Sequence, residues 1–88
     1  MRSEITIVNK LGLHARAAVK LVELATTFNS EIALVRDGKS VNGKSIMGVM
    51  MLAASKGTVV ELIVDGSDEL LALEKIKDLV RQRFGENE

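Results

Sequence analysis

The only histidine of this 88-residue chain, His14, lies in the segment LGLHARAA, two residues before Arg16. A neutral imidazole is a nucleophile, and a nearby guanidinium can stabilise a phosphoryl group through charge-assisted hydrogen bonds. One nucleophile beside one cation is typical of a group carrier rather than of a complete catalytic site. These residues alone leave an alternative open for each of them. His14 could merely cap the helix or lie in a surface loop, and Arg16 could be a solvated arginine at the helix start.

The segment GKSVNGKS, residues 38–45, matches the phosphate-loop pattern G-x-x-x-x-G-K-[ST]. Such a loop joins a buried parallel strand to a helix, so that its backbone N–H groups can wrap around a polyphosphate. Here Asp37-Gly38 indicates a hairpin turn, and the residues between the two glycines are needed for a returning strand. We therefore predict no nucleotide site. Ser45 is expected to start a helix, where unpaired N–H groups favour an anion on or near it.

The composition excludes several other kinds of function. The chain has no cysteine and a single histidine, so we expect no metal site and no cofactor. Twelve Lys and Arg balance twelve Asp and Glu, and Trp and Tyr are absent, which argues against nucleic-acid binding. The N-terminal MRSEITIVNK is too polar for a signal peptide, and the longest apolar run is too short to span a bilayer. We expect a cytoplasmic protein without membrane insertion.

The hydrophobic periodicity predicts the elements that would position these residues. They are a strand at about 3–9, a helix over 15–28, strands over 31–36 and 39–42, a short helix from 46, a strand over 58–64 and a final helix over 69–84. This order favours an α+β domain covering residues 1–88, in which a mostly antiparallel sheet carries helices on one face. Within the short helix, Ile46, Met50 and Leu52 or Ala53 could share one face.

Three methionines, Met47, Met50 and Met51, follow Ser45 closely. Flexible thioethers suit a surface that must accept several partners, and at least one of these side chains should be exposed. The alternative is that they fill gaps in the core, and we favour this alternative for Met50.

Three segments together resemble one known family over essentially the whole chain. They are NKLGLHARAA at 9–18, GKSVNGKSIMGVMML at 38–52 and KGTVVEL at 56–62. The chain is similar to HPr, the histidine-containing phosphocarrier of the bacterial phosphoenolpyruvate-dependent sugar phosphotransferase system. This resemblance implies an open-faced β-sandwich of order βαββαβα, with a four-stranded antiparallel sheet covered on one face by three helices.

The resemblance also implies roles for particular residues and partners. His14 would take a phosphoryl group on Nδ1 from phosphorylated enzyme I and pass it to sugar-specific IIA proteins or domains. Arg16 and the backbone of Ala15 and Ala17 would contact the phosphate, and an HPr kinase/phosphorylase would modify Ser45. A transcriptional regulator is a further possible partner, and the chain would be a monomer. The partner interface would comprise Lys20, Lys44, Ile46, Met47, Met50 and Met51.

Two positions depart from the family pattern. Ala17 stands where relatives usually have proline, and Glu23 stands where several have lysine. A glutamate there would alter docking to acidic partners. The alternative function is therefore a mainly regulatory paralogue in a nitrogen-type phosphotransferase branch, which signals through its phosphorylation state.

Overall fold

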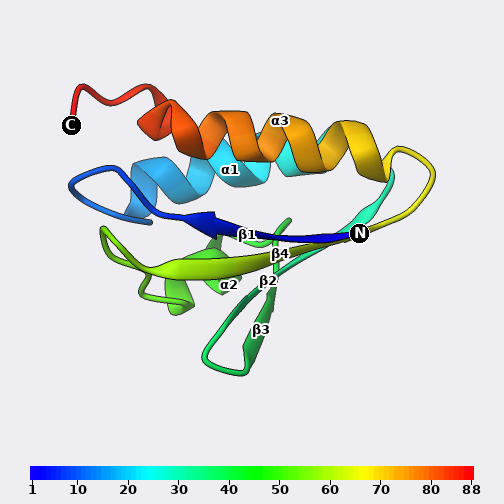
Figure 1. The fold of residues 1–88 in the computed structure, drawn as a ribbon, viewed down its shortest axis with the longest axis horizontal. Coiled ribbons are helices and arrows are strands. Elements are labelled where there is room, and N and C mark those ends of the chain that lie inside the picture. Colours follow the sequence, from blue (N-terminus) through cyan, green and yellow to red (C-terminus); the bar gives the residue numbers. More distant parts are fainter.

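The computed structural model describes residues 1–88 and has the predicted order βαββαβα (Figure 1). All strand pairs are antiparallel, and the four strands lie in the order β1-β4-β2-β3. Figure 1 shows α1 and α3 together on one face of the sheet, whereas α2 packs against α1 and β3. The elements are β1 (Arg2–Thr6), α1 (Ala15–Thr26), β2 (Glu31–Arg36), β3 (Lys39–Asn42), α2 (Ile46–Met51), β4 (Val59–Asp65), α3 (Glu69–Arg81) and a 3-10 turn (Arg83–Gly85).

The sheet forms because its strands alternate apolar and polar side chains, which places one apolar face against the helices. As predicted, Val60, Leu62 and Val64 of β4 are fully buried, and Ile5 of β1 pairs with Val60. β1 ends at Thr6 instead of residue 9. Beyond it, Ile7 exchanges backbone hydrogen bonds with the loop at residues 57–58 and is fully buried. The predicted strand was therefore too long because its end pairs with a loop.

Helix α1 presents a buried stripe to the sheet, comprising Ala17, Ala18, Leu21, Val22 and Ala25. It ends at Thr26, two residues before the predicted end, and the hydroxyl of the capping residue Thr27 donates to the Leu24 carbonyl. Phe28 is still buried. The apolar spacing therefore identified the buried residues correctly, although the last of them lies outside the helix.

Helix α3 buries Ala72, Ile76 and Val80, and it ends at Arg81 rather than at residue 84. Arg83 and Phe84 adopt left-handed φ values of 57° and 56°, which no right-handed helix accommodates. Phe84 is nevertheless fully buried. The predicted continuation of the helix to residue 84 was wrong, because the backbone leaves the right-handed helical conformation at Arg83.

Helix α2 has only six residues, and only Val49 within it is buried. Val49 and Leu52, three residues apart, fill the core-facing side, so Ile46 and Met50 are exposed. Leu52 therefore does not share a face with Ile46 and Met50, and the core position favoured for Met50 was wrong, since this side chain is 39% exposed. Met47 and Met51 are also exposed, as expected for at least one of the three methionines. No helix in the structure combines the length and the apolar character needed to cross a membrane.

Candidate functional site

His14 immediately precedes α1 and is its N-cap residue, with extended backbone dihedral angles. Its carbonyl accepts the first helical hydrogen bond from the Ala18 N–H at 2.8 Å, and its side chain makes no capping bond. The preceding loop is fixed by the Leu13 N–H, which donates to the Ala54 carbonyl at 2.9 Å. Gly12, with φ +66°, allows this approach, because a Cβ there would lie 2.5 Å from the same carbonyl oxygen. The imidazole is thus free of capping and 28% exposed.

The first turn of α1 presents backbone donors beside the imidazole. Ala15, Arg16 and Ala17 are its first three residues, and their N–H groups precede the first helical hydrogen bond. The Arg16 side chain is exposed and makes no hydrogen bond or ion pair within the chain. The Ala17 side chain is fully buried. The arrangement offers an anion a helix N-terminus and an unpaired cation.

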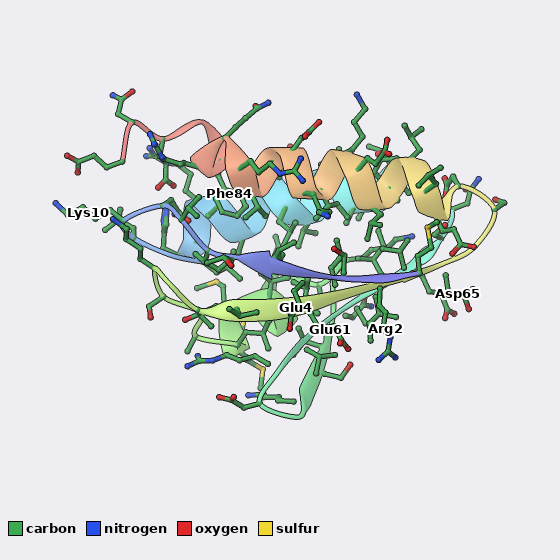
Figure 2. The ribbon with its side chains drawn as sticks, in the orientation of Figure 1. Arg2, Glu4, Lys10, Glu61, Asp65 and Phe84 are labelled. Atoms are coloured by element: carbon green, nitrogen blue, oxygen red, sulfur yellow. The ribbon has the colours of Figure 1, made fainter.

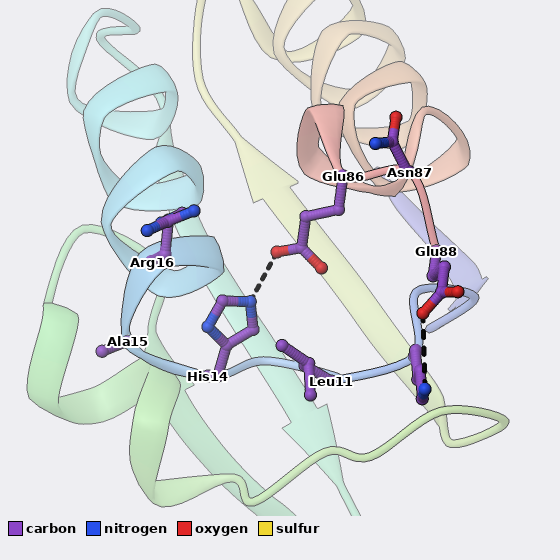
Figure 3. A pocket seen from close by; sticks show the side chains of 8 residues that line it. Leu11, His14, Ala15, Arg16, Glu86, Asn87 and Glu88 are labelled. Atoms are coloured by element: carbon purple, nitrogen blue, oxygen red, sulfur yellow. Dashed lines mark hydrogen bonds and ion pairs between the residues drawn. The ribbon is translucent and has the colours of Figure 1, made fainter.

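The sequence did not predict Glu86, whose carboxylate lies against the imidazole (Figure 3). Its Oε2 is 2.5 Å from Nε2 of His14, and its Oε1 accepts a hydrogen bond from Nδ2 of Asn9 at 3.0 Å. The hydrogen bond with His14, helped by that with Asn9, lowers the pKa of Glu86 against the opposing effect of burial. Its closeness to His14, 72 residues earlier in the chain, follows from no local sequence pattern.

A surface hollow surrounds the imidazole, and Figure 3 shows the side chains that line it. Leu11 lies beside the ring and is 66% exposed, although the sequence did not single it out. The hollow is lined by Lys10, Leu11, His14, Ala15, Arg16, Glu86, Asn87 and Glu88. The structure therefore brings the predicted pair His14 and Arg16 together with an acidic C-terminal segment.

The two lysines expected at a partner interface are tied to backbone carbonyls. Lys20 Nζ donates to the Phe84 carbonyl at 2.6 Å, and Lys44 Nζ donates to the Phe28 carbonyl at 2.7 Å. The apolar members of the expected interface, Ile46, Met47, Met50 and Met51, are all exposed. The exposed surface of α2 is consequently more apolar than charged.

Ser45 caps α2 as predicted, since its Oγ accepts a hydrogen bond from the Gly48 N–H at 3.1 Å. The segment from Gly38 to Ser45 is not a phosphate loop. Gly38 lies in a hairpin turn, residues 39–42 form β3, and Lys44 is turned toward the Phe28 carbonyl. At Gly43 a Cβ would lie 2.6 Å from the Ile32 side chain, so this glycine permits close packing. The predicted division of this segment into a turn, a short strand and a helix cap is confirmed.

Comparisons with known proteins agree on one family. Residues 1–82 match the family model described as the PTS HPr component phosphorylation site. The chain is 52% identical over 88 residues to the phosphocarrier protein HPr of Neisseria meningitidis serogroup B, covering all of this chain and 99% of that protein. A crystal structure of HPr from Thermoanaerobacter tengcongensis superposes with a TM-score of 0.96 at 45% identity, covering 100% and 99% of the two chains. The Bacillus subtilis protein Crh, whose crystal structure reveals a swapping domain and a dimer, has a TM-score of 0.77 at 51% identity and covers 84% and 85%.

Proposed function

This chain belongs to the HPr family of phosphocarrier proteins of the phosphotransferase system, and from that membership we propose that His14 is the phosphoryl carrier. The donor is phosphorylated enzyme I, and the acceptors are sugar-specific IIA proteins or domains. The observation that carries the proposal is the placement of the imidazole at the start of α1, beside free backbone N–H groups and Arg16.

The transfer needs no other catalytic group on this chain. The lone pair of Nδ1 attacks the phosphorus atom, and the N–P bond forms as the bond between the donor and phosphorus breaks. The three phosphoryl oxygens then face the N–H groups of Ala15, Arg16 and Ala17 and the Arg16 guanidinium. In the second step an acceptor nucleophile attacks phosphorus, the N–P bond breaks, and its electron pair returns to Nδ1.

Incubation with enzyme I and phosphoenolpyruvate tests the carrier role. We expect one acid-labile, base-stable phosphate on the wild-type chain and none on His14→Ala. Arg16→Ala should accept the group more slowly by about tenfold, because a charge-assisted hydrogen bond to the transition state is lost. Equal labelling of His14→Ala would refute the proposal.

The partner surface proposed here comprises Leu11, which lies beside His14, and the exposed apolar residues of α2, a helix that packs against α1: Ile46, Met47, Met50 and Met51. Charged substitution of Met47, which is 69% exposed, should slow transfer without loss of stability, because the side chain contributes little to the core. Transfer assays with sugar-type and nitrogen-type IIA acceptors also separate the carrier from the regulatory alternative. Transfer to nitrogen-type acceptors alone would favour the regulatory paralogue suggested by Ala17 and Glu23.

We further propose that Ser45 is a site of regulatory phosphorylation by an HPr kinase/phosphorylase. Its hydroxyl lies at the start of α2, next to the exposed Ile46 and Met47. A phosphate on Ser45 would therefore place negative charge on the proposed partner surface. Ser45→Asp should therefore slow transfer from enzyme I while α2 remains folded, as measured by circular dichroism. A Ser45→Asp chain that accepts phosphate at the wild-type rate would contradict this role.

A further inference from the structure

The C-terminal segment departs from the course of α3 through three consecutive residues with positive φ. Arg83, Phe84 and Gly85 have φ values of 57°, 56° and 80°. Residues with a Cβ rarely adopt this conformation, because the Cβ approaches the following carbonyl oxygen. Two adjacent non-glycine residues in it persist only where the surrounding structure holds them, and such strain is concentrated at functional sites.

Two contacts hold this turn in place. The Phe84 side chain is fully buried, although it lies beyond the end of α3 (Figure 2). Its carbonyl accepts a hydrogen bond from Lys20 Nζ of α1 at 2.6 Å. The turn is therefore anchored to the core and to α1, and the residue that follows it is directed toward the start of that helix.

The residue so directed is Glu86, and both of its carboxylate oxygens are engaged. Oε2 lies against Nε2 of His14, while Oε1 accepts from Nδ2 of Asn9, which also donates to the Gly12 carbonyl at 2.8 Å. Asn9 is fully buried, and its two hydrogen bonds fix the direction of its amide group. Glu86 also lies beyond residue 82, where the match to the family model ends.

An ionised carboxylate can only accept hydrogen bonds, so Nε2 of His14 must carry the proton that they share. In a neutral imidazole the other nitrogen, Nδ1, then holds the lone pair. Figure 3 shows that this nitrogen faces Ala15 and Arg16, away from Glu86. We propose that Glu86, held by the 83–85 turn and by Asn9, is a positioning residue that selects Nδ1 of His14 as the phosphoryl acceptor. This inference rests on the proposed carrier function of His14.

The same contact balances charge during transfer. When Nδ1 bonds to phosphorus and Nε2 keeps its proton, the ring becomes a cationic phosphoimidazolium. The Glu86 carboxylate is its counter-charge at 2.5 Å, and no proton has to move. When the group leaves, the electron pair of the N–P bond returns to Nδ1 and the ring is again neutral, with its proton still on Nε2.

Nitrogen-15 NMR of histidine-labelled full-length chain tests the choice of nitrogen, because protonated and unprotonated ring nitrogens give distinct signals. In the neutral ring of the wild type we expect the Nε2–H tautomer to exceed the other by at least about tenfold. Glu86→Ala should lower this excess severalfold, toward the modest preference of an imidazole without a partner at Nε2. Glu88→Gln is the matched control, since it removes one charge from the same segment without touching the ring, and it should retain the wild-type ratio.

Phosphorylation with phosphoramidate provides a second measurement that needs no partner protein, since Nδ1 displaces ammonia from phosphorus. The wild type should carry the phosphate on Nδ1, whereas Glu86→Ala should react about tenfold more slowly and at both nitrogens. The proposal would be overturned if Glu86→Ala kept both the wild-type tautomer ratio and phosphorylation on Nδ1 alone. It would also be overturned if Glu88→Gln changed the tautomer ratio as much as Glu86→Ala does. If enzyme I leaves His14 unlabelled while these effects occur, the carrier function fails and the positioning role stands.

Discussion

At the scale of single residues, the chemistry of the site depends on groups that the chain holds in fixed directions. His14 has one ring nitrogen against Glu86 and the other toward the helix start. Arg16, by contrast, is exposed and has no partner within the chain. The Asp68 carboxylate is likewise held by hydrogen bonds, but its role is structural. Its carboxylate accepts hydrogen bonds from the Asn29 N–H at 2.8 Å and from the N–H and hydroxyl of Ser30.

The pKa of Asp68 is lowered, chiefly by the Ser30 hydroxyl and then by the Asn29 N–H. A lowered folded-state pKa contributes stability above the unfolded-state pKa, and that contribution is lost as pH falls through the folded-state value. Asp68→Asn should therefore be less stable than the wild type at pH 7, and the difference should shrink below about pH 4. Urea denaturation at both pH values measures it. Asp65→Asn, which removes an exposed carboxylate without a hydrogen-bond partner, is the control. A difference that does not change with pH would contradict this account.

At the scale of elements, the segment that follows α2 contains a residue with an unusual backbone conformation. Ala53 has φ +51° and an exposed side chain, at a position after a helix where glycine is preferred. Its carbonyl accepts a hydrogen bond from Arg36, and that of Met51 accepts one from Lys39, so two cations complete this helix end.

Ala53→Gly should stabilise the fold by about 0.5 to 1 kcal/mol. The left-handed conformation costs a residue with a Cβ about 1 to 2 kcal/mol, and part of this gain is offset by the greater freedom of glycine in the unfolded chain. The midpoint of urea unfolding measures the change. Ala54→Gly is the matched control, because Ala54 is buried and has no positive φ, so its substitution should destabilise. A loss of stability in Ala53→Gly would show that the strain is not released.

In the sheet, Glu4 of β1 lies directly opposite Glu61 of β4. Figure 2 shows both with Arg2 on the face away from α1 and α3, and Arg2 pairs with Glu61 at 3.4 Å. Like charges at directly opposed positions destabilise a sheet. The open face thus contains one unfavourable pair that a single substitution can remove.

Glu4→Lys should raise the free energy of unfolding by about 0.2 to 1 kcal/mol, because it replaces a repulsive cross-strand pair with an attractive one. Thermal unfolding at low and high salt measures the gain, which should shrink as salt screens the charges. Thr6→Lys, opposite the uncharged Val59, should show no such salt-dependent gain. Equal effects of the two substitutions would rule out the cross-strand explanation.

At the scale of the whole molecule, one sheet and its helices share a continuous core of 21 buried apolar residues. β1 is an edge strand, and the segment that connects it to α1 is held by several contacts. Ile7 is bonded to residues 57–58, Asn9 to Gly12, and Leu13 to Ala54. Exchange of β1 between two copies would require this segment to open.

We expect the chain to be a monomer of about 9.5 kDa at micromolar concentration. The contacts of the connecting segment are already satisfied within one copy, so a swapped dimer would gain little to offset its loss of translational and rotational freedom. Light scattering across a concentration series measures the mass. A mass near twice this value that falls on dilution would contradict the expectation, and Gly12→Ala would then show whether the segment is the hinge.

The sequence alone was sufficient for features that depend on neighbouring residues. The order of the elements, the Asp37-Gly38 turn, the Ser45 cap and the location of His14 before a helix follow from periodicity and turn chemistry, which act over a few positions. Only the tertiary structure determined which side chains meet. Met50 is exposed because Val49 and Leu52 occupy the core side of α2, and Glu86 reaches His14 because a left-handed turn follows α3. Such contacts join residues far apart in the chain, and packing of the whole core decides them.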